Sequence, residues 1–368
     1  MKLGVEAALV RGELVAGDVG VDDGRIVAVG LSGGTRGRVA IPGFVDLQVN
    51  GYGGVDFLSA STEDYERAGE ALLLAGVTAY QPTFITSAEA TTVEAVRALP
   101  RAGRGPRVLG AHLEGPFLSP DRPGTHPLEH LRAPDVALLD RLLDAGAVTQ
   151  MTLAPELPGA DALVERLLQR GVAVSAGHTN ATAGEADHAF DLGVGGVTHV
   201  FNAMRPFRSR DPGVAGAALT RAGVVIAMVV DGHHLADETV RLVWACAAGR
   251  TALVTDAIAA AGNGGNAGTF QLGDVEVEVG EGAAPMRGDG TLAGTVLTMI
   301  DAVRNLHALG VPFEQAVGAA TEVPARFLGR ADVGVLEPGA SADVVVLDDR
   351  LEIQAVLCAG HGDVVARD

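Results

Sequence analysis

The chain has 368 residues, of which 48% are hydrophobic and 20% are charged, so it can bury a full core in one large domain and a smaller one. Its formal net charge of −19 argues against nucleic acid and anionic membranes as partners, because most of its surface would repel phosphate groups. The only two cysteines, Cys246 and Cys358, exclude a disulfide framework and a cysteine-based zinc site, and we expect both in the core.

The sequence contains no run of about 18 apolar residues, and its first residues lack the pattern of a signal peptide. We therefore expect a soluble protein of the cytoplasm. Lys2 is the only lysine, and it lies far from any predicted site. Schiff-base chemistry, a P-loop and a carboxylated-lysine metal bridge each need a lysine inside the site, so the sequence argues against all three.

Residues 1–41 read as short strands, and the Asp23-Gly24 dipeptide between two of them predicts a two-residue hairpin turn. The C-terminal residues 338–368 have the same β-rich character. We therefore predict that both ends of the chain form one small β-sandwich domain. The catalytic domain would then comprise residues 42–337.

Between these ends, eight apolar runs rich in β-branched residues alternate with helical patterns. The runs are IPGFVDLQ, VTAYQPT, RVLGAHLE, VTQMTLAP, VAVSAGH, GVTHV, VVIAMVVD and TALVTD. One helical segment opens with Thr182 and Glu185 at the spacing of a capping box. This rhythm is typical of a TIM-type (β/α)₈ barrel; the alternative, a doubly wound sheet, lacks a Gly-x-Gly-x-x-Gly turn after the first strand. We predict that the Gly-rich residues 262–294 form a β-hairpin insertion over the site.

Polar residues follow the predicted strands at their carboxyl ends, where barrel enzymes place their reactive groups. These residues are Gln48, Asn50, His112, Glu114, His178, His199 and Asp256. A single histidine at a strand end is more often a hydrogen-bonded structural residue. Because four strand ends share the feature, we expect Glu114, His178, His199 and Asp256 to converge on one point.

One carboxylate oxygen and two imidazole nitrogens, with a position left for water, are a typical ligand set for a catalytic divalent ion. Such an ion lowers the pKa of its water towards about 7, so hydroxide can attack an unactivated carbonyl. Asp256 would take the proton and deliver it to a leaving amine, as hydrolysis of an amide requires. The alternative for Asp256 is a helix N-cap in front of AIAAAG.

Seven motifs in register resemble those of the N-acetylglucosamine-6-phosphate deacetylase family of the amidohydrolase superfamily. They are PGFVDLQVNGYGG, GAHLEGPFLSP with GTH following, SAGHTNAT, THVFNAM, DGHHL, LVTDAIAAAG and GTLAGTVLTM, and they span nearly the whole chain. The resemblance implies hydrolysis of N-acetyl-D-glucosamine 6-phosphate to glucosamine 6-phosphate and acetate, in amino-sugar catabolism and cell-wall recycling. The alternatives are the galactosamine epimer or another N-acyl substrate and, more remotely, a non-catalytic scaffold.

The resemblance implies that Glu114, His178 and His199 are the metal ligands and that Asp256 is the catalytic acid and base. It places His126 at the acetamide or the sugar hydroxyls. The residues that it assigns to the sugar phosphate and hydroxyls are Asn202, Ala203, Arg210 and His234. It further implies a homodimer in which Arg210 reaches the neighbouring site.

Many amidohydrolases carry His-x-His on the first strand for a second metal, whereas this chain has Gln48 and Asn50. Neutral amides are poor ligands beside imidazole, so one divalent ion per chain is predicted. Zn²⁺ is the first choice, with Fe²⁺, Mn²⁺ and Co²⁺ as alternatives. Two assignments stay open: whether His112 supports a ligand or contacts substrate, and whether His233 or His234 binds the sugar.

Overall fold

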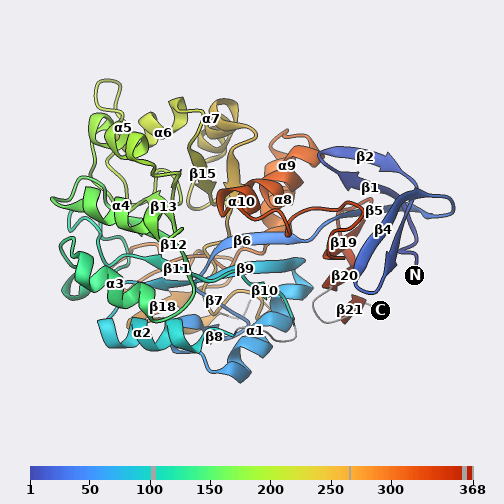
Figure 1. Ribbon diagram of the computed structural model, residues 1–368, viewed down its shortest axis with the longest axis horizontal. Helices are drawn as coiled ribbons and strands as arrows, with labels where there is room; N and C mark the ends of the chain where they lie inside the picture. Colours follow the sequence, from blue (N-terminus) through green and yellow to red (C-terminus); the bar gives the residue numbers. More distant parts are fainter. Residues whose placement is uncertain (101–104, 265–266, 359–362, 367–368) are drawn as a thin grey trace.

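The computed structural model describes residues 1–100, 105–264, 267–358 and 363–366. Eight parallel strands form its centre, and each pairs with the next one in chain order (Figure 1). They are β6 (Phe44–Val49), β9 (Val77–Ile85), β11 (Ala111–Glu114), β12 (Val148–Leu153), β13 (Ala173–Ala176), β14 (Gly196–Val197), β15 (Val225–Met228) and β16 (Thr251–Leu253). A parallel bridge between Val49 and Ala257 joins the first strand to the segment after the last, so the barrel prediction is confirmed.

Helices cover the outside of this barrel (Figure 1). They are α1 (Thr62–Leu74), α2 (Glu89–Ala98), α3 (Val136–Asp144), α4 (Ala160–Gln169), α5 (Ala183–Leu192), α6 (Gly213–Thr220), α7 (Asp237–Ala247), α8 (Met299–Ala308), α9 (Phe313–Ala319) and α10 (Glu322–Phe327). The predicted capping box is present at the start of α5, where Thr182 and Glu185 accept each other's backbone N–H groups. Among the described residues, no helix has the length and hydrophobicity needed to span a membrane.

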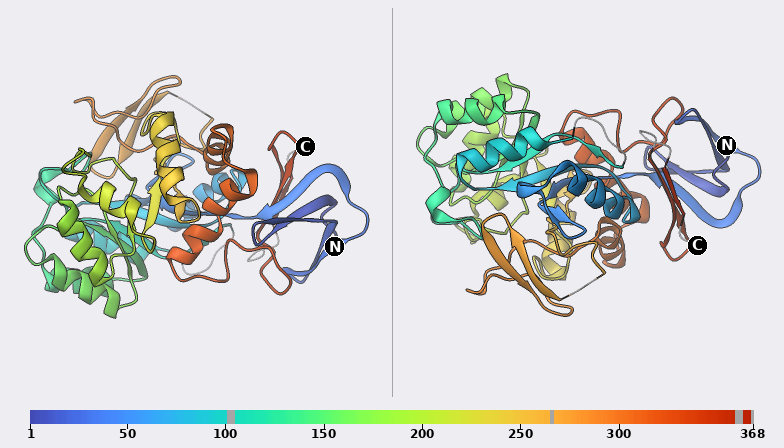
Figure 2. Two further views of the ribbon diagram at one scale, coloured as in Figure 1. Left: turned by 90° about the horizontal axis from the view of Figure 1, so that it is seen from above. Right: turned by 90° about the horizontal axis from the view of Figure 1, so that it is seen from below.

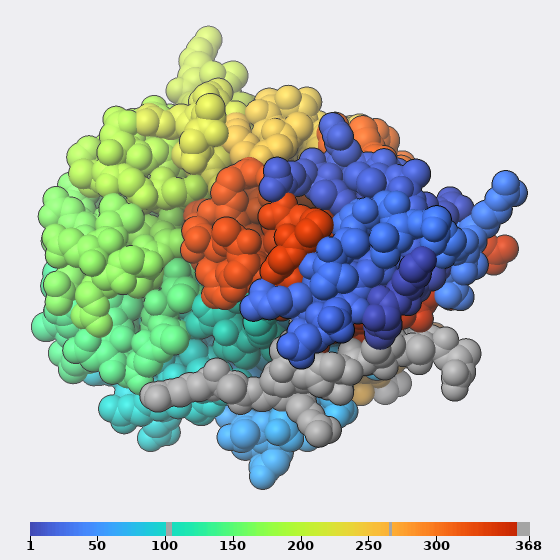
Figure 3. All heavy atoms as spheres, turned by 45° about the vertical axis from the view of Figure 1, so that its right-hand side comes forward, coloured from blue at the N-terminus to red at the C-terminus, as the bar shows by residue number. Residues whose placement is uncertain are grey.

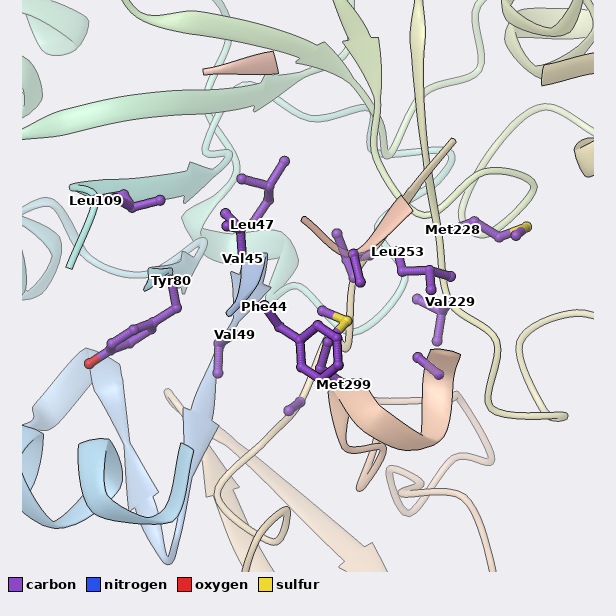
Figure 4. Packing of buried hydrophobic residues seen from close by; sticks show 14 of the residues in the cluster. Phe44, Val45, Leu47, Val49, Tyr80, Leu109, Met228, Val229, Leu253 and Met299 are labelled. Carbon is purple, nitrogen blue, oxygen red and sulfur yellow. The ribbon is translucent and has the colours of Figure 1, made fainter. Parts of the chain in front are cut away.

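The core between barrel and helices is apolar. All nine residues of β9 are buried, as expected for a parallel strand that is covered on both faces. Figure 4 shows Phe44 of β6, Leu253 of β16 and Met299 of α8 packed together, and all three are buried completely. Each such side chain contributes about 1.5 to 3 kcal/mol through its removal from water. This packing fixes the strand ends that carry the site.

Strands from both ends of the chain pair in one six-stranded sheet beside the barrel (Figures 1 and 2). In order across the sheet they are β2 (Glu13–Ala16), β1 (Val5–Val10), β5 (Thr35–Pro42), β19 (Val344–Asp348), β20 (Ile353–Cys358) and β21 (Asp363–Ala366). A second sheet of β3 (Asp18–Asp22) and β4 (Arg25–Leu31) turns at the predicted Asp23-Gly24 hairpin and shares an apolar cluster with the first. We propose that residues 1–41 and 338–368 form the small domain and residues 42–337 the catalytic one.

An antiparallel hairpin of β17 (Gly268–Leu272) and β18 (Val275–Val279) lies along one side of the barrel (Figure 2). Its apolar face packs on Ile85 and Ile258 at the barrel mouth. A hydrogen bond also fixes the turn of the hairpin: the backbone N–H of Gly273 donates to the carboxylate of Asp56 at 3.2 Å. The hairpin therefore has a fixed position next to the strand ends.

The two cysteines differ in exposure. Cys358 on β20 is buried, as predicted, whereas Cys246 on α7 is exposed. The prediction for Cys246 was wrong because its position on the amphipathic helix faces away from the barrel.

Candidate metal centre and active site

Three predicted side chains meet above the carboxyl ends of the barrel strands. Glu114 Oε1 lies 3.2 Å from His178 Nε2 and 3.0 Å from His199 Nε2, and the two nitrogens are 3.1 Å apart. All three residues are buried. Burial raises the pKa of Glu114, but the two imidazoles outweigh burial and hold this pKa well below its usual range. The cluster is thus an ionised oxygen with two ring nitrogens beside it.

These atoms fit a divalent metal ion. With metal–ligand bonds of about 2.0 to 2.1 Å, tetrahedrally arranged ligand atoms lie roughly 3.3 Å apart, close to the separations in this cluster. The ring of His178 is oriented for the task, because its Nδ1–H donates to the carbonyl oxygen of Arg122 at 3.2 Å. The lone pair of Nε2 is therefore directed into the space between the three ligand atoms. A hydrogen bond from the other ring nitrogen to a carbonyl oxygen is the usual support of a metal-binding histidine.

The local backbone at the site is unusual. His178, His199 and Asp256 each follow a strand end and each has a positive φ, of 48°, 29° and 51°. Non-glycine residues adopt this conformation at a cost and keep it where the surroundings hold them, as happens most often at functional sites. Gly124, with φ of 55°, allows a close approach to His178, since a Cβ there would lie 3.0 Å from the ring.

Asp256 lies next to the three clustered side chains and is held by two amides, Gln48 on strand β6 and Asn50 directly after it. Asn50 Nδ2 donates to its Oδ1 at 2.7 Å, and Gln48 Nε2 donates to the same oxygen at 3.1 Å and to Glu114 Oε1 at 3.3 Å. The amides therefore bind carboxylates instead of a metal. No helix begins among the described residues directly after Asp256, so the alternative of a helix N-cap was wrong.

His126 brings a hydrogen-bond donor to the same place. Its Nδ1 accepts the backbone N–H of Thr86 at 3.1 Å, so the proton of the neutral ring sits on Nε2. Burial and the neighbouring His178 hold the pKa of His126 well below its usual range. Nε2 lies 3.7 Å from Glu114 Oε2 and has no hydrogen-bond partner among the described residues. A buried donor of this kind is suited to polarise a carbonyl oxygen.

These groups open into one cavity of about 330 Å³. Its lining comprises Asn50, Ile85, Glu114, Gly124, Thr125, His126, His178, His199, Asn202, Ala203, His234, Asp256, Leu272, Gly290, Thr291, Leu292 and Gly294. Leu272 belongs to the predicted hairpin, which therefore does border the site. His234 lines the cavity with Nδ1 bound to Asp231 at 2.8 Å, which leaves Nε2 for a ligand. His233 is exposed and is not among the described lining residues.

Two predicted candidates lie outside the cavity lining. His112 is buried below it, and its ring nitrogens contact the hydroxyls of Thr83 at 3.2 Å and Thr152 at 2.7 Å. Burial lowers the pKa of His112 to about 4, so it is a neutral part of the barrel interior. Arg210 is exposed on the loop between β14 and α6. This loop projects from the barrel surface in Figure 3.

Sequence reasoning missed the residues whose role depends on contacts across the barrel. Thr86 orients His126, and Ile85 lines the cavity. Leu272 and residues 290–292 also line it; the predicted insertion contains them but did not single them out. None of them belongs to a residue type that signals chemistry. The amides of Gln48 and Asn50 could have been assigned as donors, since a buried carboxylate needs partners.

Fold and site together define a barrel hydrolase with a centre for a divalent metal. The model of the Amidohydrolase family matches residues 39–363. Human N-acetylglucosamine-6-phosphate deacetylase is 40% identical over 344 residues, which cover 88% of this chain and 83% of the human protein. The N-acetylgalactosamine-6-phosphate deacetylase of Escherichia coli O157:H7 is 36% identical and matches 87% of this chain and 86% of its own.

A solved structure of Mycobacterium smegmatis N-acetyl-D-glucosamine-6-phosphate deacetylase is similar over 98% of both chains, with a TM-score of 0.91 and 35% identity. It is an aspartate-to-alanine variant in complex with N-acetyl-D-glucosamine 6-phosphate. The chain belongs to the amidohydrolase family and, within it, to the N-acetylglucosamine-6-phosphate deacetylases, as the seven motifs predicted.

Proposed function

We propose that this chain hydrolyses the acetamide of N-acetyl-D-glucosamine 6-phosphate in the cytoplasm and releases acetate and D-glucosamine 6-phosphate. The proposal rests on one observation: a metal-binding cluster, a carboxylate and a buried N–H donor converge in a single cavity. Together these groups can activate a water molecule, transfer its proton to the leaving amine and polarise the carbonyl oxygen, as metal-assisted hydrolysis of an amide requires. Membership of the family supports the choice of substrate.

Glu114, His178 and His199 would hold one divalent ion, and we propose Zn²⁺ before Fe²⁺, Mn²⁺ or Co²⁺. When bound, such an ion supplies the acidity that makes a water molecule nucleophilic near neutral pH. The neutral side chains Gln48 and Asn50 keep their amide protons directed at the carboxylates, which supports one ion per chain.

Asp256 takes the proton of the attacking water and returns it to the amine that leaves. Its Oδ1 accepts hydrogen bonds from the amides of Gln48 and Asn50, so we assign the proton transfer to Oδ2. Burial and the nearby carboxylate of Glu114 raise the pKa of Asp256. A higher pKa makes Asp256 a better base for the first transfer and keeps the proton available for the second.

His126 stabilises the negative charge that develops on the acetamide oxygen when the carbonyl carbon becomes tetrahedral. Its Nε2–H donates to the carbonyl oxygen of the acetamide, and this hydrogen bond strengthens as negative charge builds on that oxygen. The hydrogen bond from Thr86 to Nδ1 fixes the tautomer that this role requires.

The phosphate needs specific donors, because a protein with a net charge of −19 repels a dianion over most of its surface. His234, Asn202 and Ala203 line the cavity and would hold the sugar and its phosphate. Arg210 is exposed and is not among the described residues that line its own cavity. We therefore assign it to the phosphate in the neighbouring site of a homodimer.

Arg210→Ala is expected to lower kcat/KM for the 6-phosphate by about 10- to 150-fold, mainly through KM. This corresponds to one charge-assisted contact of about 1.5 to 3 kcal/mol. Unphosphorylated N-acetylglucosamine should be much less affected, because it lacks the contact. Arg208→Ala, which removes another exposed arginine of the same loop, is the matched control. Equal losses on both substrates would show that Arg210 supports the fold or the dimer instead.

Acetate release from a panel of N-acetyl hexosamine 6-phosphates tests the function as a whole. We expect the highest kcat/KM with N-acetyl-D-glucosamine 6-phosphate. A higher value with N-acetyl-D-galactosamine 6-phosphate would favour the epimer, which the similar E. coli enzyme's name specifies. If the metal-loaded protein released no acetate from any member of the panel, the result would favour the alternative of a non-catalytic scaffold.

A further inference from the structure

Glu156 is a carboxylate near the site that has no part in the proposed reaction. It follows the carboxyl end of β12, which supplies none of the proposed ligands, and is partly buried. Its Oε2 accepts the hydroxyl of Thr179 at 2.5 Å, and its Oε1 accepts the backbone N–H of Asn180 at 2.6 Å. Two short hydrogen bonds to an ionised acceptor are stronger than hydrogen bonds between neutral groups.

Both of these donors come directly after the metal-binding residue His178. Thr179 is completely buried, and its backbone links two loops: its N–H donates to Ala203 O at 3.1 Å, and its carbonyl accepts the N–H of Arg205 at 2.9 Å. Ala203 lines the cavity. Thr179 is therefore the junction between the loop of a metal ligand and the loop that borders the substrate.

The residue before this junction, His178, has an unfavourable backbone conformation. His178 has a φ of 48°, which a histidine keeps only where neighbouring groups fix the chain on either side. The carbonyl oxygen of His178 accepts the N–H of Ser119, and its ring donates to Arg122 O. Glu156 restrains the two residues that follow, through the hydroxyl of Thr179 and the backbone N–H of Asn180. Asn180 has further contacts with Asp121, Arg122 and Arg205, whereas Glu156 is the acceptor that Thr179 and Asn180 share.

We propose that Glu156 is a positioning residue that keeps His178 and the Ala203 loop in the geometry needed to bind the metal and the sugar. It acts through Thr179 and Asn180 and is not among the described residues that line the cavity. The inference rests on the proposed function for its effect on turnover. Its effect on metal affinity does not depend on the substrate.

The test compares Glu156→Gln with a matched control, Glu185→Gln on helix α5. Glu185 accepts the same two kinds of donor, the backbone N–H and the hydroxyl of Thr182, both at 2.8 Å, but it caps α5 and does not contact the site. Replacing either glutamate by glutamine removes a charged acceptor from one threonine and one backbone N–H. Only the first replacement affects the residues beside His178.

Zn²⁺ affinity, measured by competition with a chromophoric chelator, is the main readout. Outer supports of metal ligands typically contribute about 10- to 100-fold to metal affinity or activity, so we expect a loss in that range for Glu156→Gln and less than about twofold for Glu185→Gln. At saturating Zn²⁺, kcat of Glu156→Gln should also fall. Thermal unfolding of the metal-free proteins checks that both variants fold.

Thr179 supplies a second pair of variants. Thr179→Val removes the hydroxyl and should reproduce the loss of Zn²⁺ affinity, whereas Thr179→Ser keeps the hydroxyl and should restore most of it. Affinity within twofold of the parent for Glu156→Gln, or equal losses for Glu156→Gln and Glu185→Gln, would overturn the proposal. A weakened metal site in a protein that releases no acetate would refute the proposed function and leave the positioning role intact.

Discussion

Asp256→Asn is expected to keep the metal and to lower kcat by about 10² to 10⁴, the usual contribution of general acid and base catalysis. An asparagine can still accept the hydrogen bonds of Asn50 and Gln48 through its amide oxygen, so the local structure should survive. Its NH₂ group replaces Oδ2 and cannot carry the proton from water to the leaving amine. Steady-state kinetics at saturating metal, together with metal analysis of the variant, measure both effects.

A matched control for this variant is Asp18→Asn on β3, in the two-stranded sheet that β3 forms with β4. Asp18 is also a buried carboxylate and accepts the backbone N–H groups of Val5 and Val19, at 3.1 and 2.8 Å. It is remote from the cavity lining, so turnover should stay within about twofold of the parent even if stability falls. A rate for Asp256→Asn within a few-fold of the parent would mean that Asp256 has only a structural role.

Removal of the metal with a chelator is expected to abolish acetate release, and about one equivalent of divalent ion per chain should restore it. In the part of the chain that the structure describes, Glu114, His178 and His199 form the only group of three metal-binding side chains. At the position of a second ion, Gln48 and Asn50 direct N–H groups at carboxylates, which disfavours a cation.

Metal analysis of the purified protein and a reconstitution titration measure this stoichiometry. Restored activity should level off at one ion per chain, and Zn²⁺, Fe²⁺, Mn²⁺ and Co²⁺ can be compared in the same assay. Two tightly bound ions per chain in the unmodified protein, or full activity after metal is removed, would contradict the prediction.

Most of the fold could be predicted because its signals are local. The barrel strands lie in short apolar runs of the sequence that alternate with helical patterns. The Asp23-Gly24 turn needs two positive φ angles, which are present at 44° and 67°, and the capping box of α5 depends on residues three apart. The exposure of Cys246 could not be predicted, since it depends on which face of α7 packs on the barrel.

The site was predictable where strand ends bring side chains together, as for Glu114, His178 and His199. It was not predictable where a role depends on hydrogen bonds across the barrel. The tautomer of His126 is set by a backbone N–H of Thr86, and Glu156 acts on a segment that follows it by more than twenty positions. Such partners become visible only when the loops are placed in three dimensions.

Strand β5 is synthesised long before β19, one of the two strands with which it pairs. It pairs with β1 on one side and with β19 on the other, where Pro42 lies opposite Val344. At about 5 to 20 residues per second, a ribosome needs on the order of tens of seconds to travel between these two positions. During this time the barrel sequence emerges while one edge of β5 is open, and an open edge is a template for pairing with other chains. The six-stranded sheet is thus completed only after the barrel sequence has been made, and until then the open edge of β5 can pair with other chains.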